Sequence, residues 1–274
     1  MNWRSIWAIA RKDLKEVSQN KAAWAPAVIV PLIFAIVMPV VFTVLPQVIP
    51  VEDVERELGD IETLLRKLPP TMSVWFDGLA LEQAFIVYMM GFMIAPLFLI
   101  MPLIFSSVVG AESFVGERER KTMEALLYTP ATDLELFLGK ILAAVIPAIL
   151  LSWLTYLVYI IVVNVASFRL FERIWFPLPT WWPLMLWLTP AFALLGISAT
   201  VLISSRVKTF MEAYQLSASL VVLVLALVVG QATGVLFLGV GAVFLIGSLI
   251  WIVGSILIYV SVQNFKRSSL IAKL

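Results

Sequence analysis

The stretch that decides the fold runs from residue 213 to residue 265 and reads AYQLSASLVVLVLALVVGQATGVLFLGVGAVFLIGSLIWIVGSILIYVSVQNF. Its 53 residues include no Asp, Glu, Lys or Arg. As a single helix it would extend about 80 Å, whereas the hydrocarbon core of a bilayer is about 30 Å thick. We therefore predict that the chain turns back near residues 230–234, through a simple or a re-entrant loop, and crosses the membrane twice.

Four other uncharged runs precede this stretch, at residues 22–51, 83–111, 141–168 and 174–205. Each exceeds the roughly 20 apolar residues that a membrane-spanning helix needs. The sequence therefore predicts an all-α integral membrane protein in which residues 22–274 form one membrane domain. Its six transmembrane helices are expected at about residues 25–49, 84–110, 139–163, 183–204, 213–231 and 239–262.

The composition of the whole chain agrees with this class. Hydrophobic residues make up 62% and charged residues 14%, against roughly 45–50% and about 25% in soluble domains. The formal net charge of +1 gives no electrostatic support for nucleic-acid binding. The chain has no Cys and no His, which excludes disulfides and the commonest metal ligands.

The positions of Lys and Arg predict the orientation. Fourteen of the nineteen lie in the two termini and in the second and fourth connecting loops, and five lie on the other side. Because the cytoplasmic loops of membrane proteins carry an excess of Lys and Arg, both termini are expected in the cytoplasm. The expected location is the cell membrane, with several crossings.

Residues 1–21 are expected to form a cytoplasmic amphipathic helix lying on the membrane surface. An apolar stripe recurs at helical spacing with three basic side chains beside it. The stripe comprises Trp3, Trp7, Ala10, Leu14 and Val17, and the basic side chains are Arg4, Arg11 and Lys15. Two interpretations stay open, a membrane anchor and a lever linked to a cytoplasmic partner.

The first outer loop, residues 52–82, contains eight acidic and three basic side chains. Apolar residues at helical spacing in its first part, followed by Pro69 and Pro70, predict a short external amphipathic helix. A solvated lid is one interpretation of this loop and an acidic substrate-binding site is the other.

The longest cytoplasmic loop, residues 111–138, carries the most informative pattern. Oppositely charged residues four apart, Glu117 with Lys121 and Arg120 with Glu124, predict that the helix of the second span continues into solvent. An apolar edge on that helix is formed by Met123, Leu126 and Leu127.

A second helix is expected at the end of this loop. Thr129-Pro130 should stop the first helix, and the capping-box pair Thr132 and Glu135 should start another that leads into the third span. The loop would then be a helical hairpin, either an ordinary charged connection or a docking surface on which a polar rim surrounds an apolar edge.

Several chemistries are excluded by what the sequence lacks. Gly139-Lys140 is not part of a phosphate-binding loop, because residues 134 and 141 are Leu and Ile. The predicted span cores contain no Asp, Glu, Lys or Arg, which disfavours a proton-driven carrier. We expect no catalytic residue, no bound cofactor and no metal, so the chain should not be an enzyme.

Small residues recur every seven positions in the last predicted span, at Gly247, Gly254 and Ser261. Such residues allow membrane helices to approach closely. We expect helix packing at these positions, either within the subunit or at a boundary between subunits.

The loop before the third span is similar to the corresponding loop of the ABC-2 type permease family, the membrane subunits of certain ATP-binding-cassette transporters. The similarity lies in Glu117-Arg118-Glu119, Thr122, Glu124, Leu126-Leu127, Thr129-Pro130 and Gly139-Lys140. One departure is Lys121, where the family commonly has Gly.

This resemblance implies a permease that pairs with a second permease, identical or related, and with two cytoplasmic ATPase subunits that bind ATP and Mg, usually for export. It also implies that residues 112–128 couple the two kinds of subunit. The residues expected to take part are Glu112, Glu117, Arg118, Glu119, Lys121 and Glu124 as polar contacts, and Met123, Leu126 and Leu127 as an apolar seat. The alternative is a membrane-embedded scaffold that tethers an ATPase without transporting a substrate.

Overall fold

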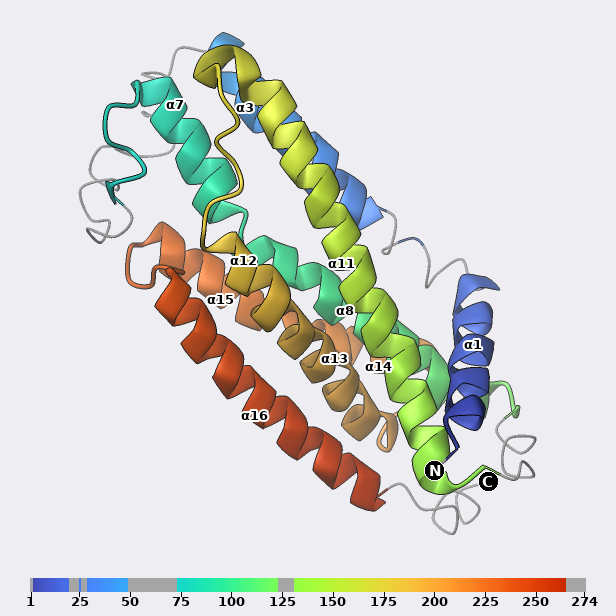
Figure 1. Cartoon of the computed structure of the whole chain (residues 1–274). Coiled ribbons are helices and arrows are strands. Elements are labelled where there is room, and N and C mark those ends of the chain that lie inside the picture. Colours follow the sequence, from blue (N-terminus) through green and yellow to red (C-terminus); the bar gives the residue numbers. More distant parts are fainter. Residues whose placement is uncertain (1, 20–24, 26–28, 49–72, 123–130, 265–274) are drawn as a thin grey trace.

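The computed structural model describes residues 2–19, 25, 29–48, 73–122 and 131–264, which are helical with short connections and contain no strand (Figure 1). In chain order the elements are α1 (Trp3–Gln19), η1 (Ile33–Val37), α3 (Met38–Val48), α7 (Leu81–Ile86), η2 (Val87–Met93), η3 (Pro96–Leu99), α8 (Ile100–Ala111), η4 (Glu112–Gly116), α9 (Glu117–Glu119), α11 (Asp133–Phe171), α12 (Trp181–Pro183), η5 (Leu184–Leu188), α13 (Thr189–Ser204), α14 (Phe210–Ala218), α15 (Val221–Ala232) and α16 (Val240–Asn264).

Five stretches are long and apolar enough to cross a membrane, which confirms a multi-pass all-helical protein. They are Leu81–Glu119, Asp133–Phe171, Trp181–Ser204, Phe210–Ala232 and Val240–Gln263. The first predicted span is represented among the described residues by the shorter apolar helix Ile29–Val44, so the count of six stays a prediction. The predicted external helix after residue 52 and the predicted break at Thr129-Pro130 lie outside the described residues.

The predicted reversal inside the long uncharged stretch is confirmed. α15 ends at Ala232 and α16 begins at Val240, and the connection between them contains Gly234 at φ 73°. A positive φ suits glycine because it has no Cβ. From this connection α16 runs along α13 and η5, whereas α15 contacts η2, η3 and α8 (Figure 1).

The stretch Leu81–Glu119 is broken in its middle, before Pro96. Proline has no backbone N–H to donate to the preceding turn, and three carbonyls in front of it accept side-chain hydrogen bonds instead. The pairs are Tyr159 Oη to Met90 O, Trp181 Nε1 to Gly91 O and Gln231 Nε2 to Phe92 O, each at 2.8 Å. Donors from three other helices therefore bond to backbone carbonyls at the break, in a region where a membrane interior supplies no water.

The main hydrophobic core surrounds Trp181, which is fully buried. Its ring lies 5.2, 5.1 and 5.0 Å from the ring centroids of Tyr159, Phe98 and Phe176. Edge and offset contacts of this kind add to the free energy gained from area burial. The core therefore fixes the helix break and the start of the stretch Trp181–Ser204 relative to α11.

The small residues of α16 lie against other helices of the same chain. A Cβ on Gly247 would stand 2.5 Å from Cδ1 of Trp187, and one on Gly254 would stand 3.3 Å from Cδ2 of Leu194. Ser261, one turn before the end of α16, is 3% exposed. These contacts support packing within the subunit. A role of the same residues at a subunit boundary stays a prediction.

α1 packs along the first half of α11, parallel to it (Figure 1). The backbone N–H of Asn2 donates to Glu135 near the start of α11, whereas Leu14 and Val17 lie near Pro147 and Leu151, more than three turns further on. A helix that follows a membrane-crossing helix over this length shares its inclination. α1 therefore runs in the same direction as the first half of α11, and its predicted position on the membrane surface stays a prediction.

The amphipathic helix itself is present, and its buried face shares Ala10 and Val17 with the predicted stripe but differs from it in the first two turns. Its buried side chains are Ile6, Ile9, Ala10, Asp13 and Val17. Trp3 and Trp7, which we expected in the stripe, are 58% and 47% exposed. The reason is that α11 covers the neighbouring face, and a charged residue, Asp13, lies in the middle of it.

Candidate functional site

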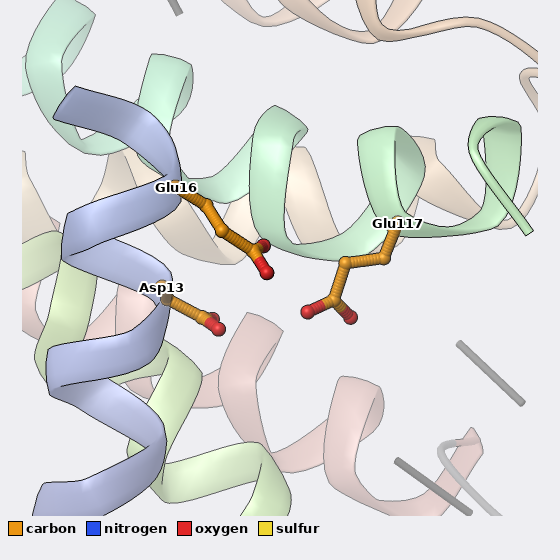
Figure 2. Close-up of side chains that lie close together, drawn as sticks. All are labelled: Asp13, Glu16 and Glu117. Atoms are coloured by element: carbon orange, nitrogen blue, oxygen red, sulfur yellow. The ribbon is translucent and has the colours of Figure 1, made fainter. Parts of the chain in front are cut away.

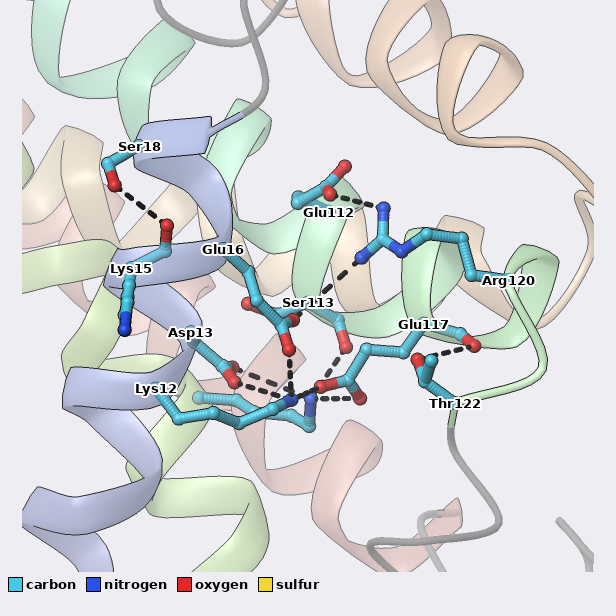
Figure 3. Close-up of polar contacts among 11 residues, drawn as sticks. Lys12, Asp13, Lys15, Glu16, Ser18, Glu112, Ser113, Glu117, Arg120 and Thr122 are labelled. Atoms are coloured by element: carbon cyan, nitrogen blue, oxygen red, sulfur yellow. Dashed lines mark hydrogen bonds and ion pairs between the residues drawn. The ribbon is translucent and has the colours of Figure 1, made fainter.

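Five charged side chains gather where α1, α9 and the start of α11 meet (Figure 3). We call this group the ionic cluster; its members are Lys12, Asp13, Glu16, Glu117 and Lys140. It draws together residues that are more than 100 positions apart in the sequence. The cluster therefore connects the N-terminal helix to both helices that flank the 111–138 loop.

Lys140 occupies the buried centre of the ionic cluster. Its side chain is 1% exposed, and its Nζ donates to Glu117 Oε2 at 2.6 Å, to the carbonyl of Ser113 at 2.6 Å and to Asp13 Oδ2 at 3.5 Å. Nζ also lies 5.5 Å from the centroid of the Phe114 ring, within reach of a cation–π interaction. A buried ammonium group is tolerated only when its donors are satisfied in this way.

Lys12 reaches the same carboxylates from the rim. Its Nζ forms a short hydrogen bond with Glu117 Oε1 and ion pairs with Asp13 at 3.3 Å and Glu16 at 3.2 Å. Burial acts to lower the pKa of Lys12, but the hydrogen bond to Glu117 and the three nearby carboxylates outweigh it and raise the pKa above its ordinary value. Lys12 is therefore protonated throughout the physiological pH range.

The two lysines balance the two fully buried carboxylates. Side chains of Asp13 and Glu117 are 0% exposed, and each of them pairs with both Lys12 and Lys140. Two positive and two negative charges leave this part of the cluster neutral. Removing any one of the four would leave the remaining three with an unbalanced charge, and of the four only Lys12 is partly open to water.

Gly139 allows α1 to come close enough for these contacts. A Cβ at this position would stand 2.8 Å from Cγ2 of Ile9 and 3.1 Å from the carbonyl oxygen of Ile6. A larger residue at position 139 would collide with α1. The pair Gly139-Lys140 therefore has two linked roles. The glycine admits α1, and the lysine supplies the cation that ties α1 to Glu117.

The helical stretch Leu81–Glu119 ends directly after the cluster. α9 stops at Glu119, and Lys121 takes φ 59°, in the left-handed region. The N–H of Thr122 then donates back to the carbonyl of Glu117 at 2.9 Å, which closes the helix end. Arg120 turns back to pair with Glu112 at 2.5 Å, and Glu112 is itself 2% exposed.

Neighbouring residues tie the same helix end to the turn before α14. The guanidinium group of Arg118 donates to the carbonyl of Ser204 at 2.8 Å and to that of Val207. Glu119 accepts a hydrogen bond from the N–H of Phe210 at 2.8 Å. These contacts satisfy backbone groups at the end of α13 and the start of α14, which a helix leaves unpaired.

Three carboxylates of the cluster, from Asp13, Glu16 and Glu117, point toward one another, with oxygen atoms all within 4.8 Å (Figure 2). Oxygen ligands at such spacing suit a hard divalent cation. Here the ammonium group of Lys12 contacts all three. The arrangement is therefore an ion-pair network, and it does not need a metal to balance its charge.

The predicted solvated helix after the second span is wrong in two respects. The helix ends at Glu119, so Glu117 does not pair with Lys121 on a continuing helix, and the side chains of Glu112 and Glu117 are buried. Among the predicted polar contacts described by the structure, Glu119 and Lys121 are exposed and Arg118 is half-buried. The predicted residues Met123, Glu124, Leu126 and Leu127 lie outside the described residues.

Sequence reasoning missed the N-terminal half of the cluster. Asp13 carried a usable signal, because it is an acidic residue in line with the apolar positions Ile6, Ile9 and Val17 of the same helix. A charge on an apolar helix face needs a partner of opposite charge. The capping box of Thr132 and Glu135, by contrast, is confirmed at the start of α11.

Long apolar helices with a charged junction at one end define a multi-pass membrane protein. Residues 7–265 match the family described as ABC-2 family transporter protein. The chain belongs to this family and is a permease subunit of an ATP-binding-cassette transporter, a membrane subunit without the ATP-binding cassette. No curated protein and no solved structure matches the chain.

Proposed function

We propose that the chain is the permease of an exporter in the cell membrane, driven by two separate ATPase subunits that dock at the 111–138 loop. A second permease, identical or related, would complete the transport path. ATP and Mg would bind on the ATPase subunits alone. Both termini and the ionic cluster would face the cytoplasm, the side on which most Lys and Arg of the sequence are expected.

The ionic cluster is the observation that carries this proposal. It joins α1, α9 and α11 through buried charges, while Arg118 and Glu119 join α9 to the turn between α13 and α14. Separating a buried ion pair costs several kcal/mol, about 3–5 when one partner is lost. A force applied to the loop would therefore move these helix ends together, as coupling requires.

The docking role falls on the exposed residues of the loop. Glu119 and Lys121 would contact the ATPase directly, with Met123, Glu124, Leu126 and Leu127 completing the surface as the resemblance implies. Glu112, Glu117 and Arg118 would act from inside, because they hold the helix end in place. Reversing the charge of Glu117 would disrupt the cluster and would not test docking.

Purification of the tagged full-length chain in mild detergent tests the partnership. We expect an ATP-binding-cassette ATPase to accompany the chain, and Lys121→Glu to reduce its recovery severalfold. Two controls separate docking from folding. Lys121→Gly removes the charge without backbone strain, because glycine readily adopts the conformation at this position. Arg173→Glu reverses an exposed charge on the predicted outer side of the membrane. Equal recovery with Lys121→Glu and Arg173→Glu would place the contact elsewhere.

A second experiment separates an exporter from a scaffold. The chain has no cysteine, so spin labels can be placed at Val235→Cys and Ile174→Cys, both strongly exposed at the predicted outer end. In the complex with its ATPase, an exporter should change the distance between the labels when ATP is added. A distance that does not respond to ATP, in a complex that hydrolyses it, would favour the scaffold.

A further inference from the structure

An apolar groove lies between α1, α8 and α11. Its cavity volume is about 340 Å³, within the range of small-molecule sites, and it is open on one side. The lining residues are Leu14, Val17, Ser18, Phe105, Pro147, Leu150, Leu151 and Leu154. The serine is the only hydroxyl-bearing side chain among them, so the groove suits a hydrocarbon chain.

The groove lies where α11 enters the membrane. Charges return to α11 at Arg169, near its outer end, and a bilayer core takes up about 20 helical residues. Counting inward from Phe168 places the inner boundary of the core near Ile149, about ten residues after the start of the predicted span at residue 139; the buried charge of Lys140 then lies outside the hydrocarbon core. The groove residues Pro147 to Leu154 straddle this boundary, which is the level at which lipid headgroups meet acyl chains.

The open side of the groove continues onto the exposed apolar face of α11. Leu150, Leu154 and Leu157 are 55%, 60% and 57% exposed, at positions that should face the hydrocarbon core. A soluble partner does not reach this depth, whereas an acyl chain enters the groove sideways from the bilayer.

Two basic residues of α1 lie within one helical turn of the groove residues Leu14 and Ser18: Arg11 is three positions before Leu14, and Lys15 is three positions before Ser18. Arg11 and Lys15 are exposed, and neither forms an ion pair with the described part of the chain. Arg11 shares a second surface hollow with Trp3, Arg4 and Trp7, residue types that are common at the headgroup level of membranes. The groove therefore has an apolar body and a cationic rim, which complements a lipid with a negatively charged headgroup.

We propose that this groove binds one anionic phospholipid of the inner leaflet, with an acyl chain along Leu14, Leu150 and Leu154 and the phosphate between Arg11 and Lys15. The lipid fills the opening between α1 and α11 beyond the point where the ionic cluster holds them. This site does not depend on the export proposal, because it requires only α1, α8 and α11.

Spin-labelled lipids provide the test, with the full-length chain in bilayers of equal parts phosphatidylglycerol and phosphatidylcholine. The fraction of each labelled lipid immobilised by the protein gives their relative affinity. We expect a preference for phosphatidylglycerol, which Arg11→Gln and Lys15→Gln each reduce by up to about fivefold. Lys208→Gln, at an exposed lysine away from the groove, should leave the preference unchanged.

A matched pair of leucines tests the apolar part. Leu154→Trp should fill the groove and reduce immobilisation of both lipids, whereas Leu157→Trp, at an equally exposed position outside the lining, should not. Equal behaviour of the two variants would overturn the proposal. If Arg11→Gln and Lys15→Gln leave the lipid preference unchanged but weaken ATPase recovery, the proposal is also overturned, and this face belongs to a protein partner. A cross-link from Leu14→Cys to a second copy of the chain would overturn it as well.

Discussion

Replacing Lys140 with Met tests whether the ionic cluster holds α1 against the membrane domain. Methionine has a similar length and fits an apolar environment, so the substitution removes the charge with little change in volume. Glu117 and Asp13 would then share only Lys12, and the carbonyl of Ser113 would lose its donor. The main effect should be on the attachment of α1.

The expected cost follows from the burial of the partners. Loss of one member of a buried ion pair destabilises by about 3–5 kcal/mol. Lys12 stays in contact with both carboxylates and its side chain is 36% exposed, so water can partly compensate, and the lower end of the range applies. A loss of about 3 kcal/mol corresponds to roughly a hundredfold increase in the opening equilibrium of α1.

Hydrogen exchange of residues 3–19 in detergent measures this opening directly. We expect exchange in α1 to accelerate about a hundredfold in Lys140→Met, with less change in α13 and α16. The control is Lys208→Met, at an exposed lysine, where the change should stay within about 0.5 kcal/mol.

A double variant checks the assigned cause. In Lys140→Met combined with Glu117→Gln, Asp13 and Lys12 remain as a neutral pair, so the double variant should lose less stability than the sum of its single variants. If α1 exchanges at the same rate in Lys140→Met as in Lys208→Met, or if the two single effects simply add, the buried charges do not hold the junction together.

Three further predictions concern other contacts. Gly139→Val should push α1 away from α11 and lower the free energy of unfolding by about 1–3 kcal/mol. The measurement is cross-linking between Leu14→Cys and Leu151→Cys, which should be lost; unchanged cross-linking would contradict the close approach of the two helices. Gln231→Leu should lower the free energy of unfolding by about 0.6–1.7 kcal/mol in detergent denaturation, because the carbonyl of Phe92 loses its side-chain donor, whereas Gln215→Leu at an exposed position should not. Lys121→Gly should raise the melting temperature or leave it unchanged, since glycine relieves the left-handed backbone; a clear destabilisation would show that Lys121 has a contact beyond its charge.

The sequence predicted well those features that depend on local pattern. Uncharged length placed the reversal before Val240, and the spacing of Thr132 and Glu135 placed the start of α11 to the residue. In both cases the physical cause acts within one continuous segment of the chain. No knowledge of the neighbouring helices was needed.

The candidate site was predicted poorly because its partners are distant in the sequence. A pair such as Glu117 and Lys121 satisfies the spacing rule for a helix, but the rule holds only if the helix continues, and Lys121 ends it. The partners that Glu117 has in the structure come from α1 and α11, more than 100 and more than 20 residues away. Charge patterns in one segment cannot indicate such pairings.

The structure also gives physical reasons for the residues that carry the family resemblance. Gly139 is small because Ile9 packs against it, Lys140 is basic because two buried carboxylates face it, and Lys121 stands where the backbone is left-handed, a conformation that glycine adopts readily. None of these reasons requires the residue to touch another protein. A motif that resembles a docking sequence can therefore serve the junction of α1, α9 and α11. The residues that contact a partner protein are better sought among the exposed neighbours of the motif than in the motif itself.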